Sequence, residues 1–220
     1  MAARNSIRLM HCASQGINSE QPTLSDERFE TANGDTCCLI FQTIHFPGVQ
    51  SLQQVYNSLL FSLDNAEISL SERLGNVTVR DDYGDIDGNT FHARIVSTND
   101  DGVATELNCI MMSQLLGGGA CGEHPRGIIT IDSVDRDDLY PYKPKERIRK
   151  DVFAAFVLAD DSTPTTQGKT VITLRRAVYI KLHCPEFELS ESVWQEQQFE
   201  TTRWGDVLIK SMRSILYATP

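Results

Sequence analysis

The sequence has no long apolar run, and no stretch approaches the 18 or so residues that a membrane-spanning helix requires. It also has no secretory hydrophobic segment near residue 1, and its six cysteines form no C-x-x-C pair. We therefore expect an intracellular, cytoplasmic protein whose thiols are reduced and mostly buried. A single core in 220 residues can bury about 70% of the unfolded surface, so folding needs neither a metal nor a disulfide.

Basic residues are in deficit, with 20 Lys and Arg against 30 Asp and Glu and a formal net charge of −10. A general nucleic-acid binder needs a basic field that releases counterions, so we expect no nucleic-acid partner. One basic run departs from this average, and it consists of Lys143, Lys145, Arg147, Arg149 and Lys150.

The basic run has two interpretations. Near anionic headgroups each cation contributes on the order of 1 kcal/mol, so the run could form a transient contact with an anionic membrane. The alternative is a solvated loop neutralised by its acidic neighbours, which are Asp135, Asp137, Asp138 and Glu146.

Residues 1–35 are polar and aperiodic, which predicts an N-terminal arm that is loosely packed or disordered. Residues 1–19 contain Arg4 and Arg8 and no acid, so a targeting segment and an ordinary tail both remain open. The organised domain is expected to span residues 36–220.

Hydrophobic periodicity divides this domain into elements. Residues 36–46 are rich in strand formers, and residues 52–63 carry an apolar stripe of helical period after a capping pair, Ser51 and Gln54. A second short helix is expected to begin at Ser69 and to end at Gly75.

The rest of the domain alternates in strand fashion as far as residue 184, with six strands separated by polar connectors rich in Gly or Pro. A long helix follows, with a capping pair at Ser192 and Gln195. Gly205 lies inside this helix at a cost of about 1 kcal/mol relative to Ala, which close packing against a sheet or a ligand would explain.

This order of elements predicts an α+β fold. A curved antiparallel sheet of about seven strands would wrap around the C-terminal helix, with two short helices after the first strand. A gap between a curved sheet and one long helix is a common site for a small apolar ligand.

Three segments add a resemblance to a known family. Residues 139–151, 174–183 and 202–214 resemble the START-like domains of a large protist family, within the START and Bet v1-like superfamily of helix-grip proteins. Members of that family often carry a zinc finger of the phosphoinositide-binding type, which is lacking here. The resemblance implies a hydrophobic tunnel for one lipid or other apolar molecule, without a universal catalytic or binding motif and without a cofactor.

Arg176 is the most informative side chain of the last predicted strand, because it shares a face with apolar residues such as Leu174 and Val178. An unpaired guanidinium facing a cavity would cost several kcal/mol. It could therefore bind the carboxylate or phosphate of a ligand. The alternatives are a salt bridge to Asp132 or Glu106, or a strand end open to water.

Apolar residues at the other inward positions would line any cavity, although a filled core predicts the same residues. They are Phe91, Ile95, Leu107, Met111, Ile131, Phe156, Ile180, Leu208 and Met212.

These observations lead to three hypotheses of function. The first is a monomeric protein that binds, and transfers between membranes, one lipid or other small hydrophobic molecule, with no catalytic residue. The second is an enzyme of the same fold, a cyclase or hydrolase, for which His92, Asp132 and Tyr179 are the weak candidates. The third is a regulatory module whose cavity is filled. No metal site is expected, because Cys121 and His124 in the Gly-rich loop 117–125 have no second pair.

Overall fold

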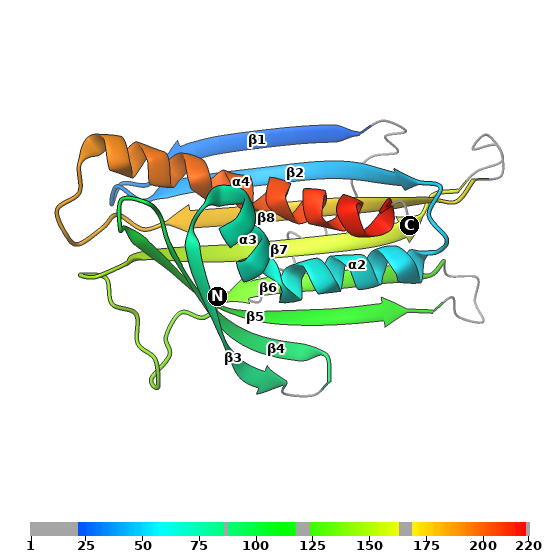
Figure 1. Cartoon of the computed structure of the whole chain (residues 1–220), viewed down its shortest axis with the longest axis horizontal. Coiled ribbons are helices and arrows are strands. Elements are labelled where there is room, and N and C mark those ends of the chain that lie inside the picture. Colours follow the sequence, from blue (N-terminus) through cyan, green and yellow to red (C-terminus); the bar gives the residue numbers. More distant parts are fainter. Residues whose placement is uncertain (1–21, 86–87, 118–123, 163–168, 219–220) are drawn as a thin grey trace.

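An eight-stranded sheet runs along the molecule and carries the described helices on one face (Figure 1). The computed structural model describes residues 22–85, 88–117, 124–162 and 169–218. The helices are α2 (Leu52–Asp64), α3 (Ala66–Leu74) and α4 (Glu191–Leu216). The strands are β1 (Thr23–Glu30), β2 (Thr36–Pro47), β3 (Val77–Asp85), β4 (Thr90–Thr98), β5 (Ala104–Leu116), β6 (Arg126–Ser133), β7 (Ile148–Asp160) and β8 (Val171–Leu182).

The strand order β1-β2-β8-β7-β6-β5-β4-β3 confirms the predicted α+β architecture. The six strands from β3 to β8 are neighbours in chain order, and β2 pairs with β8, so the first predicted strand joins the last. Past the end of β6 at Ser133, β5 and β7 pair directly through Thr105 and Ile148. This additional parallel pairing joins β5 to β7 at one end of the sheet.

The sequence does not predict β1, which lies within the residues assigned to the polar arm. All eight residues of this strand are exposed, so no apolar face marks it in the sequence. Its backbone pairs with β2 over its whole length, from Thr23 opposite Thr43 to Glu30 opposite Thr36. Residues 1–21 of the arm lie outside the described residues, as do residues 118–123 of the Gly-rich loop.

The helix boundaries agree with the sequence in part. Ser51 Oγ accepts a hydrogen bond from the Gln54 backbone N–H at 3.2 Å, which confirms the predicted start of α2. The predicted start of α3 at Ser69 is wrong, because Asn65 alone separates α2 from α3 and helical geometry resumes at Ala66. Gly75 ends α3 with a φ of 82° and donates its N–H to Ser71 O, as predicted.

The C-terminal helix α4 begins at Glu191, slightly before the predicted capping pair. Ser190 Oγ caps it by accepting a hydrogen bond from the Val193 N–H at 3.4 Å. Its 26 residues extend for about 39 Å at 1.5 Å per residue, and Figure 1 shows the helix running lengthwise over the sheet, roughly along β2 and β8. Within the described part of the chain, no helix is both long and apolar enough to cross a membrane.

The hydrophobic core lies between the helices and the concave face of the sheet. One close approach depends on Gly127 of β6, where a Cβ would lie 2.7 Å from Cδ2 of Tyr56 on α2. A glycine inside a strand is otherwise unfavourable, and here it allows α2 to pack directly on the sheet. The largest wholly buried apolar side chains include Phe46, Leu59, Ile129, Leu158, Leu174 and Met212.

Candidate ligand cavity

A cavity remains between the concave face of the sheet and helices α3 and α4. The space open to the centre of a water molecule is about 140 Å³. One ordered water needs about 10–15 Å³ on this measure, so the cavity is large enough for several waters or a small ligand. Its volume is below the usual range for the pockets of drug-sized ligands, about 300–1,000 Å³.

The cavity wall contains most of the side chains that the sequence assigned to it. Arg176 lies on the wall together with Phe91, Ile95, Leu107, Met111, Ile131, Phe156, Ile180 and Leu208. Met212 is the exception and a correction, because it is fully buried in the packed core of the α4 interface and does not line the cavity.

Other parts of the wall were not predicted from the sequence. Ala93 and Ala154 are small inward-facing residues whose size leaves space, and Trp204 covers the cavity from α4. Strand alternation could have identified both alanines, because Ala93 lies two residues from Phe91 and Ala154 lies two residues from Phe156. α3 contributes Ala66, Ser69 and Leu70 to the wall.

Arg176 is 4% exposed and points from β8 toward α4. A Cβ at Gly205 would overlap Nη1 of Arg176 and would lie 2.9 Å from its Cζ, so the guanidinium occupies the space that the glycine leaves. This contact explains the glycine inside α4.

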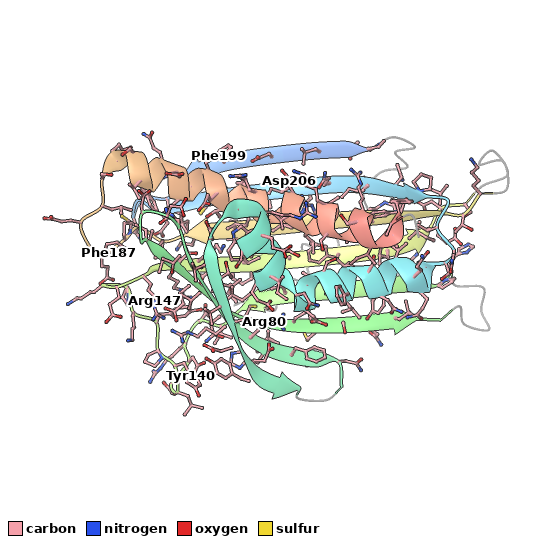
Figure 2. All side chains as sticks on the ribbon, in the orientation of Figure 1. Arg80, Tyr140, Arg147, Phe187, Phe199 and Asp206 are labelled. Atoms are coloured by element: carbon pink, nitrogen blue, oxygen red, sulfur yellow. The ribbon has the colours of Figure 1, made fainter. Side chains whose placement is uncertain are left out.

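No acidic side chain pairs with Arg176 among the described residues. The predicted salt bridge to Asp132 or Glu106 is wrong, since neither lines the cavity and Glu106 pairs with Arg94 and Arg147. Nε of Arg176 has no hydrogen-bond partner. Burial lowers the pKa of Arg176, and the exposed carboxylate of Asp206 on α4 opposes this shift (Figure 2).

Lys150 requires a correction, because the sequence placed it in a surface loop as a membrane contact. It is 2% exposed and lines the cavity. β7 already begins at Ile148, and Lys150 shares the inward face with Val152 and Ala154. Extending the alternation of β7 by one step toward residue 150 would have identified this orientation.

The ammonium of Lys150 has an aromatic contact in place of a carboxylate. Nζ lies 2.8 Å from the centroid of the Trp204 ring, and no ion pair to a described residue exists. Burial lowers the pKa of Lys150 well below its usual value, while Glu200 and Cys109 act electrostatically in the opposite direction. A buried ammonium without a paired carboxylate costs several kcal/mol.

The remaining members of the basic run lie outside the cavity. Lys143 pairs with Glu146 at 3.3 Å, and Arg149 pairs with Asp151 at 2.7 Å. Arg147 is 3.7 Å from Glu106, and Lys145 is exposed. Several cations of this run are therefore neutralised by acidic residues, which was the alternative interpretation of the sequence.

Arg80 is a third cation on the cavity wall, and its place there was not predicted from the sequence. It lies on β3 beside the end of α2 (Figure 2), where it donates hydrogen bonds to the carbonyls of Leu63 and Asp64 at 3.0 and 2.8 Å. It also forms an ion pair with Asp82 at 2.6 Å. These partners satisfy Arg80, in contrast to Lys150 and Arg176.

The described residues that line the cavity include no Asp or Glu. The candidates for acid–base catalysis, His92, Asp132 and Tyr179, do not line it either. His92 Nε2 is hydrogen-bonded to Asn108 at 2.6 Å, and the Tyr179 hydroxyl contacts Cys37 Sγ at 3.1 Å. The enzyme hypothesis thus has no support from these three residues.

A second hollow adjoins the cavity at the β1 edge of the sheet. Ile180, Thr201 and Thr202 line both spaces. Arg28 of β1 reaches across to Thr202 of α4, with Nη2 3.5 Å from its hydroxyl oxygen. The two spaces therefore adjoin at the edge between β1 and α4, where the contact between Arg28 and Thr202 spans the gap.

A long helix that crosses a curved antiparallel sheet above an apolar cavity defines the helix-grip class of proteins. Human STARD10 has a similar structure, with 12% sequence identity and a TM-score of 0.50, covering 93% of this chain and 78% of that chain. This likeness shows that the chain has a helix-grip fold like that of STARD10, as the sequence predicted.

Other solved structures are more distant. Ara h 8.0201 has 8% identity and a TM-score of 0.38, covering 82% of this chain and 99% of that chain. Protein Ms6760 from Mycobacterium smegmatis has 11% identity and a TM-score of 0.38, covering 91% and 100%. No family profile and no curated protein sequence matches the chain.

Proposed function

We propose that the protein binds one small hydrophobic molecule in the cavity between α4 and the sheet. The observation that carries this proposal is the unfilled, mainly apolar space in a fold whose superfamily the sequence resemblance links to lipid binding. Burying an apolar ligand there gains about 25 cal/mol per Å² of surface removed from water. Uptake needs only a local movement of α4 or β1, because the two spaces at that edge adjoin.

We also propose that the protein transfers its ligand between membranes. The loop between β6 and β7 presents Leu139, which is 83% exposed, close in sequence to Lys143 and Lys145. An apolar side chain beside cations is suited to an anionic membrane surface, where the cations approach the headgroups and the leucine enters the interface.

Uptake is tested with the purified chain, native mass spectrometry and a neutral fluorescent hydrophobe, Nile red. Ala93→Phe fills part of the cavity and should weaken Nile red binding at least tenfold. The matched control is Val79→Phe on β3, where the side chain is 55% exposed and outside the cavity, and binding should be unchanged. A wild-type chain that retains no compound and takes up no dye would contradict the proposal and favour a regulatory module, and a chemically altered compound would favour an enzyme.

Membrane contact is tested by flotation with phosphatidylcholine vesicles that contain or lack phosphatidylserine. The wild type should float only with the anionic vesicles, and Leu139→Ser with Lys143→Glu and Lys145→Glu should abolish flotation. Phe199→Ser on α4, where the side chain is 59% exposed, is the control for loss of an exposed apolar group. Equal flotation of the triple variant and the wild type would exclude this loop as the contact.

A further inference from the structure

Two cations inside the cavity lack the partners that buried charges normally have. Lys150 and Arg176 are 2% and 4% exposed, and neither forms an ion pair with a described residue. Buried charges in proteins are usually paired and hydrogen-bonded, because desolvation otherwise disfavours them. The exception in this cavity needs an explanation, and packing alone does not provide one.

The third cation of the wall serves as an internal comparison. Arg80 has two backbone carbonyls and the carboxylate of Asp82 as partners, so the fold does supply acceptors where a guanidinium is only structural. Around Lys150 and Arg176 the lining contains no carboxylate. The acids that influence them, Glu200 and Asp206, belong to α4 and make no hydrogen bond to either.

Both cations converge on neighbouring residues of α4 although their positions in the sheet are far apart. Arg176 pairs with Phe156 across the β7–β8 ladder, six residues from Lys150, which corresponds to about 20 Å along the strand. The Lys150 ammonium contacts Trp204, and the Arg176 guanidinium fills the space at Gly205. One ligand under this turn of α4 can therefore meet both positive charges.

Arg176 also has an unused hydrogen-bond donor. Its Nε–H has no acceptor, and a guanidinium presents its donors in a planar fork that matches a carboxylate or a phosphate. An anion in this position would supply the acceptor that the chain does not. Lys150 would add a second positive charge in a region where low polarity strengthens electrostatic attraction.

We infer that the ligand is an acidic amphiphile, whose anionic group is bound by Arg176 and attracted by Lys150 while its apolar part fills the cavity. This inference rests on the proposed function, because it assigns the charge of the molecule that the cavity takes up. The anionic group is a carboxylate or a phosphate.

The test uses the full chain and competition against bound Nile red by four molecules with the same twelve-carbon tail. These are dodecanoate, dodecyl phosphate, dodecanol and dodecylamine, each below its micelle-forming concentration. One or both anions should displace the dye at concentrations at least tenfold lower than dodecanol, and dodecylamine should be weakest. The stronger of the two anions identifies the headgroup chemistry.

Variants then assign the preference to the two cations. The preference is the ratio of the dodecanol concentration to the anion concentration that displaces half of the dye. Arg176→Met should reduce this ratio about tenfold and Lys150→Met about fivefold, as expected for the loss of one charge at a partly screened site. Dodecanol itself should compete as before. Lys210→Met is the matched control, because it removes one exposed positive charge outside the cavity and should leave the preference unchanged.

The outcomes separate this inference from the proposed function. If Nile red binds and dodecanol competes as well as both anions in the wild type, the inference is overturned while hydrophobic binding stands. If the wild type binds neither the dye nor any competitor, both fail. The wild-type comparison decides even if a variant does not fold.

Discussion

At the scale of single residues, Lys150 combines complete burial with the absence of a carboxylate partner. Its pKa in the folded protein is lowered by burial, whereas the unfolded chain has an ordinary value of about 10.4. The groups that face it are Trp204 and Glu200 of α4 and Cys109 of β5. Between the folded and the unfolded pKa the unfolded chain binds more protons, so the stability of the folded state rises with pH in that window.

Lys150→Met should therefore stabilise the ligand-free protein, by about 1–3 kcal/mol, because an apolar side chain replaces an uncompensated buried amine. The gain should be largest at the low end of the window and should shrink as the pH approaches the ordinary lysine pKa. Urea unfolding of both proteins at several pH values measures this difference. A difference that does not vary with pH, or a loss of stability at every pH, would show that Lys150 is not an uncompensated charge.

The cysteines differ sharply in their expected reactivity. Burial is the main cause that raises the pKa of Cys38 and of Cys109 to about 12, and Cys38 also donates a hydrogen bond to Asp26 at 3.2 Å. Cys184 is exposed. At pH 8 a thiol with a pKa near 12 is only about one ten-thousandth thiolate, and the thiolate is the reactive form.

Alkylation with iodoacetamide at pH 8 should therefore modify Cys184 at least a hundredfold faster than Cys38 or Cys109. Peptide mass spectrometry assigns each site, and the same reaction in urea is the control, in which the three rates should converge. Comparable rates in the folded protein would contradict the buried positions of the two slow cysteines.

Single residues also show how far the sequence can be interpreted. The inward orientation of Arg176 follows from alternation within one strand, whereas its missing partner depends on what α4 brings to the other side of the cavity. Lys150 was placed outside because its strand begins within a run of charged residues, where no alternation of apolar and polar residues is visible. Met212 was placed on the cavity because helical period identifies a face but not the distance to the sheet.

At the scale of elements, α4 is adapted to the sheet through Gly205. An Ala at this position gains about 1 kcal/mol of helix propensity, but its Cβ overlaps the Arg176 guanidinium, which has to move toward the cavity. Gly205→Ala should thus stabilise the Arg176→Met protein by about 1 kcal/mol and stabilise the wild type by less, or destabilise it. Urea unfolding of the four proteins of this double-mutant cycle gives the coupling free energy. Additive effects would mean that the two groups do not compete for the same space.

Elements with a strong period were predictable and the others were not. α2 has an apolar stripe and a capping serine, so its start agrees with the structure. β1 is wholly exposed and is held by its pairing with β2, so its sequence carries no apolar alternation. The start of α3 depends on the direct junction with α2 at Asn65, and a capping pattern inside the helix at Ser69 was misleading.

At the scale of the whole molecule, both edges of the sheet carry charges that oppose pairing with another sheet. β1 presents Asp26, Glu27, Arg28 and Glu30, all exposed. The other edge strand, β3, has an irregular register near Asp82. Charged and irregular edges disfavour edge-to-edge association, and the net charge of −10 adds repulsion between copies.

Light scattering should accordingly find a monomer. Glu27→Val combined with Glu30→Val should cause concentration-dependent association through the β1 edge. Glu186→Val with Glu188→Val, which removes the same charge elsewhere on the surface, should remain monomeric. A wild-type dimer, or association of both variants, would show that edge charge is not what keeps the chains apart.

The presence of a cavity could not be predicted from the sequence. Alternation specifies which side chains face the helices, and a filled core would use the same residues. The space depends in part on the small side chains of Ala93 and Ala154 at inward positions. These are properties of the assembled sheet and of the distance to α4.

The position of β2 between β1 and β8 has a consequence for synthesis on the ribosome. Thr36 pairs with Leu182 and Pro47 with Val171, so the central ladder joins residues that are more than 120 positions apart in the chain. Contacts between such distant residues slow folding, because the intervening chain must lose its freedom before they form. Until β8 has left the exit tunnel, the backbone edge of β2 that pairs with β8 has no partner. During translation this edge of β2 therefore stays unpaired while more than 120 further residues are added, and an unpaired strand edge is prone to aggregation.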